Sequence, residues 1–402
     1  MPQPTLPADL TLIGVDGGAT EVKAHRVRCD QAATPPAYSL LPAGAARKYQ
    51  RVSGFAPLPV AEQLAQRSQG SVDLSPAERE QGAEWVNAAC QAIVEVANTG
   101  PTGPAGTAGP VLIGMGMPGL KTPDGRGIEA INNGPRLPDY LDRLEQGLAA
   151  AGVELLCPVA VLGSDADYCG LGEQHAAEGL FRDVENAYYF GGGTGVADAL
   201  KLRGRLIPFD EIKPWMLKSW QMPSALGPTF EKLVSAASLN EGYARLTPAA
   251  SSADGGGRYP EQAAADGDPV AMAWMEVVAV TLAELIFERL DTIANGRRAR
   301  PHRGEAYGKL AAEHDYRGTI LDRVVIGQRI GQIYADPRYQ AVFAERVDRC
   351  LAALLTDCDD ANLTAGYLDG HRLKPELLRP SALRAAPALG AAVSAVQAHS
   401  TA

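Results

Sequence analysis

The feature that most constrains the fold is a strand–glycine turn–strand pattern that occurs twice. The first copy covers residues 11–27 and turns through the sequence DGGAT, and the second covers residues 187–202 and turns through GGGTG. A strand that turns through glycines into another strand is a β-hairpin, whereas the dinucleotide-binding fingerprint needs a helix after its glycines. The duplication therefore predicts two related α/β halves that face one cleft.

Composition and charge narrow the class of protein. The 402 residues are 46% hydrophobic and 21% charged, as in an ordinary globular chain. The formal net charge of −10 argues against nucleic-acid binding, because phosphate backbones are bound by clustered basic residues. Six cysteines without a C-x-x-C pair are too sparse for a disulfide scaffold, and no apolar run reaches the length of a membrane span. We expect a cytoplasmic protein without nucleic-acid or membrane partners.

Local patterns predict helices between and after the hairpins. Helical spacing of apolar residues predicts one helix over residues 76–98 and a core helix over residues 269–295, the latter between an Asp cap and a Gly stop. Residues 31–60 are rich in Ala, Pro and Gly and are expected to form an irregular insertion. Residues 99–109 are expected to be a flexible loop, and the basic residues 297–303 a solvated connection.

The two glycine turns contain the groups that a magnesium-bound polyphosphate requires. Glycines let backbone N–H groups approach phosphate oxygens, a carboxylate can hold the hard cation or its waters, and a hydroxyl can donate to an anion. The candidates in the first turn are Asp16, Gly17, Gly18 and Thr20, and those in the second are Gly193, Thr194 and Gly195. A tight hairpin turn without a ligand is the alternative for each.

A carboxylate lies between the two hairpins in the sequence. Asp165 follows a predicted strand over residues 159–162 and begins a helix. At the end of a strand it can act as the general base toward a hydroxyl that attacks a γ-phosphate. Alternatively, Asp165 or Ser164 caps the helix. The order of hairpin, carboxylate, hairpin and a late glycine turn at residues 327–331 favours a two-lobed phosphotransfer site.

Six segments in this order resemble the ROK family of sugar kinases, in the actin-like ATPase superfamily. They are residues 13–20, 114–119, 132–135, 164–173, 193–204 and 324–327. The likeness extends from about residue 10 to residue 395. It implies an α/β fold with two ribonuclease-H-like domains flanking a cleft. One lobe would hold residues 1–162 plus 383–402, and the other residues 163–382.

The resemblance implies transfer of a phosphoryl group from ATP, with Mg²⁺, to a hydroxyl of a hexose or hexose derivative. Asp165 matches the catalytic base in the family motif N-D-A-N, which reads SDAD here. The implied sugar ligands are Asn132, Asn133, Asp165, Glu231 and Glu211. The implied nucleotide and phosphate ligands are Asp16, Gly17, Gly18, Thr20, Gly193, Thr194, Gly195, Gly327 and Arg329. Asp16 would hold Mg²⁺ through water.

The chain departs from the family pattern at several positions. Family members carry a His and three Cys that bind structural zinc before the sugar-contacting Glu, but residues 213–228 contain neither, so we expect no zinc. Asp198 replaces a glycine and would place a carboxylate near the phosphates. Gln328 and Arg329 replace two further glycines, and Arg329 can stack on adenine or pair with a phosphate. The extra length falls in residues 31–75, 250–265, 298–320 and 332–375.

Other functions stay open on these residues. A sugar-binding or sugar-sensing protein that keeps the fold without efficient transfer is the alternative, and a kinase for an unusual polyol or a different phosphate donor is another. A DNA-binding ROK repressor is disfavoured, because its winged helix-turn-helix domain would precede the first turn and 15 residues precede Asp16. The expected partners are a sugar and a nucleotide, and the resemblance leaves a homodimer open.

Overall fold

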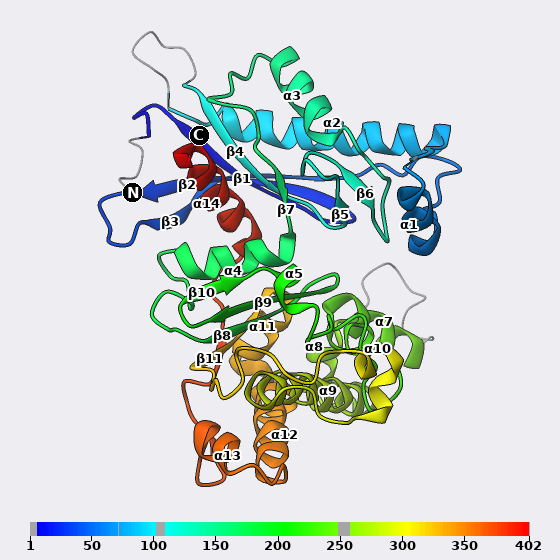
Figure 1. Cartoon of the computed structure of the whole chain (residues 1–402), viewed down its shortest axis with the longest axis vertical. Helices are drawn as coiled ribbons and strands as arrows, with labels where there is room; N and C mark the ends of the chain where they lie inside the picture. The colour runs from blue at the N-terminus through cyan, green and yellow to red at the C-terminus, as the bar shows by residue number, and fades with distance from the viewer. Residues whose placement is uncertain (1–5, 71, 102–108, 248–257, 402) are drawn as a thin grey trace. The chain divides into compact units, whose positions relative to one another are not determined.

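Contacts between residues divide the chain into two units, which we describe one at a time (Figure 1). The first unit is Met1–Gly179 with Ala385–Ala402, and the second is Leu180–Arg384. The computed structural model describes residues 6–70, 72–101, 109–247 and 258–401. Most of the expected loop over residues 99–109 and part of the expected insertion over residues 250–265 therefore lie outside the described residues.

The sheet of the first unit is built around its first strand. Its order is β3-β2-β1-β4-β7, with β1 antiparallel to β2 and parallel to β4. The strands are β1 (Thr11–Gly17), β2 (Glu21–Asp30), β3 (Ala37–Lys48), β4 (Val111–Gly116) and β7 (Leu162–Gly163). Because β1, β4 and β7 run parallel, their carboxyl ends lie at the same edge of the sheet.

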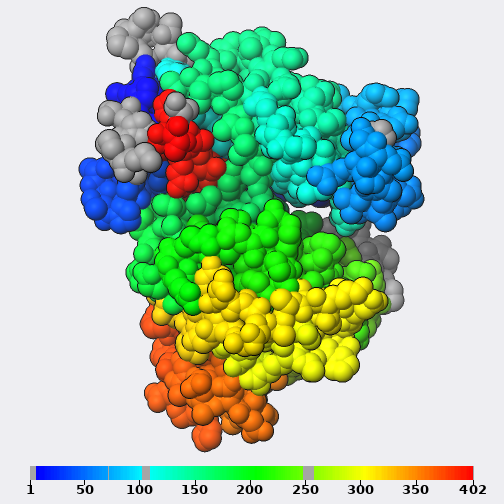
Figure 2. Space-filling model, in the orientation of Figure 1, coloured from blue at the N-terminus to red at the C-terminus, as the bar shows by residue number. Residues whose placement is uncertain are grey.

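Close helix packing explains the small residues of the central strands. Helices α2 (Pro76–Ala97) and α14 (Ala386–Thr401) both pack on β1. Any side chain at Gly14 or Gly114 would overlap the backbone of α14, at Ala388 and Ala391 respectively. Figure 2 shows this C-terminal segment, in red, beside the blue N-terminal segment of the same unit. Glycine is required here because the helix backbone approaches the sheet without room for a Cβ.

The boundary between the units differs from the predicted one. Helix α4 (Asp165–His175) packs against α14. A side chain at Gly172 would overlap the backbone at Ala386, and one at Gly390 the backbone at Tyr168. The first unit therefore extends to Gly179 instead of ending at residue 162. Its other elements are α1 (Val60–Ser68), β5 (Leu120–Lys121), β6 (Ile128–Ala130) and α3 (Tyr140–Ala150).

The second unit repeats the sheet of the first. Its order is β10-β9-β8-β11-β14, and its central strand β8 is antiparallel to β9 and parallel to β11. The strands are β8 (Ala187–Gly192), β9 (Val196–Leu202), β10 (Arg205–Ile207), β11 (Arg323–Gly327) and β14 (Leu378–Pro380). In both sheets the glycine turn joins the central strand to its antiparallel neighbour. The duplication that the hairpins predict is confirmed.

The core of the second unit is organised by one long helix, α9 (Pro269–Asn295). The Asp268 side chain caps it by accepting a hydrogen bond from the Ala271 N–H at 2.8 Å, and it ends at Gly296 with a φ of 77°. Its composition would suffice for a membrane span, but most of its residues are buried inside this unit, as in a core helix.

Shorter elements complete the second unit. They are α5 (Phe209–Ile212), α6 (Glu231–Val234), α7 (Ala236–Leu246), α8 (Pro260–Ala265), α10 (Gly304–Gly308), α11 (Gln328–Ala335), α12 (Glu345–Thr356), α13 (Ala361–Tyr367), β12 (Leu368–Asp369) and β13 (Arg372–Leu373).

Two segments are more ordered than their composition suggests. The expectation of irregular structure over residues 31–60 is wrong for residues 37–48, which form β3 and pair with β2, whereas residues 31–36 and 49–59 contain no helix or strand. The expectation of a solvated basic loop over residues 297–303 is wrong for Arg303, whereas residues 298, 299, 301 and 302 are exposed. Arg303 is 1% exposed, and Arg300 pairs with the buried Asp291. Local composition gives no sign of the strand pairing of β3 or of the burial of Arg303, whose carbonyl partner Pro223 is 80 residues away.

Candidate functional site

Two carboxylates meet at the carboxyl edge of the first sheet. Asp16 lies opposite Gly116 in the register of β1 and β4, and Gly116 lies opposite Gly163 at the end of β7. Asp165 follows two residues later, and a Cβ built on Gly116 would lie 3.7 Å from the Asp165 Cα. The Tyr168 ring lies closer still, 2.9 Å from this Cβ position, so glycine at position 116 makes room for that ring.

Burial and the nearby Asp165 carboxylate raise the pKa of Asp16 to about 6. Lys23, which lies opposite Asp16 in the register of β2, acts in the other direction. A cation bound between the carboxylates would favour their charged forms and offset this repulsion. The edge of the sheet is therefore suited to a hard cation.

This raised pKa gives a pH-dependent stability prediction. The folded state holds the Asp16 proton more tightly than the unfolded state. The free energy of unfolding therefore falls as pH rises from about 4 to about 6, and the whole of this loss of stability is present above that range. Asp16→Asn removes this loss of stability, because an amide does not ionise. Because the side chain is partly exposed, we expect a gain of about 2 kcal/mol at pH 8 and little gain at pH 4. Denaturant unfolding at both pH values measures it, with Asp139→Asn as an exposed control in the same unit.

At the start of α4, one residue caps the helix and the next carries the candidate base. The Ser164 side chain caps the helix by accepting a hydrogen bond from the Asp167 N–H at 3.4 Å. Asp165 occupies the first helical position, with its carboxylate half-exposed and accepting a hydrogen bond from the Ala166 N–H at 3.0 Å. The cap is thus Ser164, and the Asp165 carboxylate retains acceptor positions for another donor.

Each glycine turn leaves two consecutive amides free. In the first turn the Gly18 N–H donates to the Glu21 carbonyl at 2.9 Å, and in the second the Gly193 N–H donates to the Gly195 carbonyl at 2.9 Å. Within the described part of the chain, no hydrogen-bond acceptor contacts the next two amides of either turn. These are the amides of Ala19 and Thr20, and of Thr194 and Gly195. Such paired N–H groups are suited to an anion, and in the first turn they lie beyond the predicted Gly17 and Gly18.

The two candidate asparagines lie on a loop whose backbone is fixed by a buried side chain. Asn132 and Asn133 are both exposed. The preceding Ile131 is fixed by the buried Gln63, whose side chain donates to the Ile131 carbonyl at 2.9 Å and accepts from its N–H at 2.8 Å. Gln63 belongs to α1, inside residues 31–75, where the chain is expected to be longer than members of the family, and no sequence motif indicates its role.

A buried ion pair holds the other end of the same loop. The Arg136 guanidinium, which is 1% exposed, donates twice to the Glu78 carboxylate at 2.8 Å. A side chain at Gly134 would overlap the Trp85 ring. The asparagine loop is therefore rigid, although its two amide side chains face solvent.

In the second unit, Glu231 contacts the second glycine turn. Its carboxylate accepts a hydrogen bond from the Val196 N–H at 2.9 Å, and a Cβ on Gly195 would lie 2.9 Å from it. Ser235 caps α7, accepting from the Ser238 N–H at 3.2 Å, so its hydroxyl is engaged. Glu211 belongs to α5 and pairs with Arg205 at 2.8 Å.

The segment after β11 also reaches the second turn. Gln328 has a φ of 56°, and its side-chain amide lies where a Cβ on Gly193 would be. Arg329 pairs with the buried Glu261 and lies 5.4 Å from the centroid of the Tyr259 ring. The guanidinium thus has an acidic and an aromatic partner within the protein.

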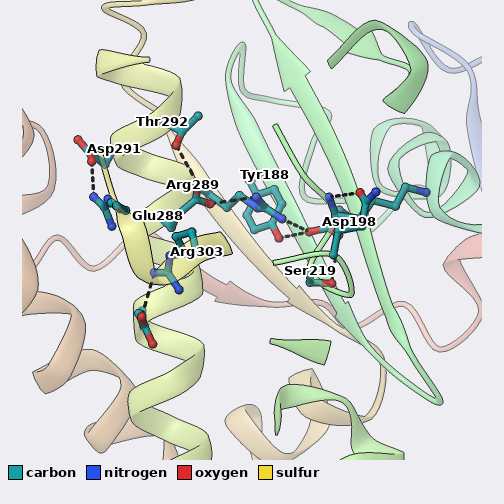
Figure 3. Close-up of polar contacts among 12 residues, drawn as sticks. Tyr188, Asp198, Ser219, Glu288, Arg289, Asp291, Thr292 and Arg303 are labelled. Carbon is teal, nitrogen blue, oxygen red and sulfur yellow. Dashed lines mark hydrogen bonds and ion pairs between the residues drawn. The ribbon is translucent and has the colours of Figure 1, made fainter. Parts of the chain in front are cut away.

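The expectation that Asp198 lies near the phosphates is wrong. Its side chain is 4% exposed and points into the core of the second unit (Figure 3). It accepts hydrogen bonds from the Tyr188 hydroxyl, from Arg289 Nη2 at 3.3 Å and from the Ser219 hydroxyl at 3.5 Å. Strand β9 alternates its side chains between two faces, and position 198 falls on the face that α9 covers.

Among the described residues, no group of three or more His, Cys, Asp or Glu side chains could enclose a metal ion. The donor set at the first sheet edge is the pair Asp16 and Asp165. Two carboxylates fit Mg²⁺, which usually keeps several waters and takes one or two protein carboxylates.

Comparisons with known proteins identify the fold. No protein-family model matches the chain, and no curated protein matches it. Among solved structures, a ROK family glucokinase from Streptomyces griseus, in complex with glucose and AMPPNP, has a TM-score of 0.57 at 15% identity, covering 96% of this chain and 99% of its own. A ROK hexokinase from Thermus thermophilus has a TM-score of 0.50 at 18% identity, covering 98% and 100%.

A protein with a different role shares the same fold. A ROK family transcriptional regulator, a homologue of the E. coli MLC protein, has a TM-score of 0.50 at 11% identity, covering 97% of this chain and 79% of its own. The fold is therefore that of the ROK proteins, which include sugar kinases and a regulator.

Proposed function

We propose that this chain, which has the fold of the ROK proteins, is an ATP-dependent sugar kinase with Asp165 as its general base. The observation that carries the proposal is the pairing of Asp16 and Asp165 at one sheet edge, beside a turn with two free amides. A cation site, a base and anion-binding amides are the parts that phosphoryl transfer requires. The solved structures with this fold support a sugar as the acceptor.

In the proposed reaction, the sugar hydroxyl donates a hydrogen bond to Asp165 and attacks the γ-phosphorus. A new O–P bond forms, the bond from the γ-phosphorus to the β,γ-bridging oxygen breaks to leave ADP, and the hydroxyl proton passes to the Asp165 carboxylate. Mg²⁺, held by Asp16 through water, would neutralise phosphate charge. The free amides of the two glycine turns would donate to phosphate oxygens in each unit.

The proposed sugar ligands are polar side chains on segments that hydrogen bonds hold in place. Asn132 and Asn133 would bind sugar hydroxyls from the rigid loop, and Glu231 would do so from the second unit. Glu211 can bind the sugar only if Arg205 releases its carboxylate.

Gly327 and Arg329 would lie on the nucleotide side, where Arg329 can bind a phosphate only by leaving Glu261. The burial of Asp198 supports nucleotide use, because it removes a carboxylate from the phosphates.

A substrate panel tests the proposal. Purified protein is assayed for coupled ADP release with hexoses, N-acetylhexosamines and polyols, using ATP and Mg²⁺, with inorganic polyphosphate as a second donor monitored by loss of donor. We expect turnover of at least one hexose or hexose derivative at about 1–10³ per second, well above the rate of ATP hydrolysis without sugar. Absence of sugar-dependent turnover with either donor would reject the kinase.

A sugar-binding protein without transfer is the second candidate, because a regulator shares the fold. Isothermal titration calorimetry separates the two. Binding of sugar without binding of nucleotide favours the sensor, whereas binding of both favours the kinase.

A further inference from the structure

A buried arginine contacts the segment that leads to Glu231. Arg303 follows α9 and is 1% exposed. Its Nη1 donates to the Pro223 carbonyl at 2.8 Å, and its Nη2 pairs with Glu284 of α9 at 2.9 Å. Figure 3 shows Arg303 alongside α9. Figure 2 shows the yellow stretch near residue 300 running along the green stretch of the same unit.

The segment that Arg303 contacts is a small hairpin-like loop. The Ser224 N–H donates to the Pro228 carbonyl at 2.8 Å, and the Phe230 N–H donates to the Met222 carbonyl at 3.1 Å. Glu284 also contacts this loop, accepting from the Ala225 N–H at 3.2 Å. The ion pair between Arg303 and Glu284 therefore fixes the loop to α9 at two backbone positions.

The same arginine reaches the residue before Glu231. Its guanidinium lies 4.6 Å from the centroid of the Phe230 ring, which is fully buried. Glu231 itself donates its N–H to the Ser219 carbonyl at 3.4 Å, and its carboxylate accepts from the Val196 N–H at 2.9 Å. A shift of Phe230 would move Glu231 relative to the second glycine turn.

We infer that Arg303 is a positioning residue of the sugar site: it holds the loop over residues 223–230 against α9 and so sets the place of the Glu231 carboxylate. The inference rests on the proposed function where it concerns catalysis. A buried ion pair gives little net stability compared with apolar residues of similar volume. Its directional hydrogen bonds to Pro223 and Glu284 instead fix one geometry.

Kinetics provide the first test. Arg303→Met removes the charge and keeps much of the volume, and each enzyme is assayed well below its own unfolding midpoint. We expect the KM for the best sugar to rise about tenfold or more, because small misplacements of a binding group are costly. The KM for the nucleotide should stay within about twofold. Arg303→Lys, which keeps a charge for Glu284, should restore part of the sugar affinity. Arg317→Met, at an exposed ion pair with Glu313, is the matched control.

A second test does not depend on activity. Hydrogen exchange is followed by mass spectrometry on the peptide that contains Val196. The N–H group of Val196 donates a hydrogen bond to the Glu231 carboxylate in the structure. We expect this peptide to exchange about tenfold faster in Arg303→Met, and unchanged exchange in Arg317→Met. Unchanged exchange in Arg303→Met, or a parallel rise of both KM values, would overturn the positioning role. If the wild-type protein phosphorylates no sugar, the proposed function fails, and the exchange test still decides the inference.

Discussion

Replacing Asp165 with Asn is expected to lower kcat by about 10²- to 10⁴-fold, because an amide cannot take the proton of the attacking hydroxyl. The asparagine keeps the size of the side chain, so sugar and nucleotide should still bind. The measurement is coupled ADP release at saturating sugar and ATP, with calorimetry of both ligands. Since Ser164 provides the helix cap, loss of the Asp165 charge should cost the helix only about 0.3–1 kcal/mol.

The control is a carboxylate in a comparable place. Asp139 precedes α3 of the same unit, is exposed and lies 4.0 Å from Arg143. Asp139→Asn should leave kcat unchanged. Full turnover by Asp165→Asn would show that another group accepts the proton.

The second large effect is expected at the buried pair of Asp198 and Arg289. Asp198→Ala should destabilise the second unit by about 3–5 kcal/mol, because it removes one of the two carboxylates that pair with the fully buried Arg289 guanidinium. Burial opposes the charge of Arg289, but Asp198, Tyr188 and Glu288 together raise its pKa above the ordinary value. Urea unfolding of the full chain, followed by tryptophan fluorescence, measures the loss.

A double variant tests the cause of this loss. Asp198→Leu combined with Arg289→Met removes both charges and replaces them with apolar volume, so it should recover a large part of the stability. Glu288 keeps a hydrogen bond from the Thr292 hydroxyl at 2.8 Å in the double variant. A single variant that loses less than about 1 kcal/mol would contradict the buried charge network.

Local signals in the sequence predict the repeated hairpins and the core helix. The helix α9 begins after Asp268 and ends at Gly296 because a cap and a stop act through neighbouring residues. Strand β3 gives no such signal, since its composition of Ala, Gly and Pro is poor in strand formers. It is extended because it pairs with the preceding strand β2, a pairing that its own composition does not indicate.

The same distinction applies to the candidate site. Asp16 lies at the carboxyl end of β1 and Asp165 follows β7, and parallel strands bring these ends to one edge, so their proximity can be predicted. Asp198 could not be placed from sequence, because the arginine that neutralises it is 91 residues away. Arg303 is likewise 80 residues from the carbonyl that it contacts. The place and role of a buried charged residue depend on partners that are distant in sequence and come close only in the folded chain.

The most direct test of the proposed function is ³¹P NMR of the protein with ATP, Mg²⁺ and the best sugar from the panel. The account predicts that the γ-phosphate resonance of ATP falls while a sugar phosphomonoester resonance rises in equal amount, and that Asp165→Asn suppresses both changes. Loss of the γ-phosphate to inorganic phosphate alone, or an unchanged spectrum with every sugar, would contradict it.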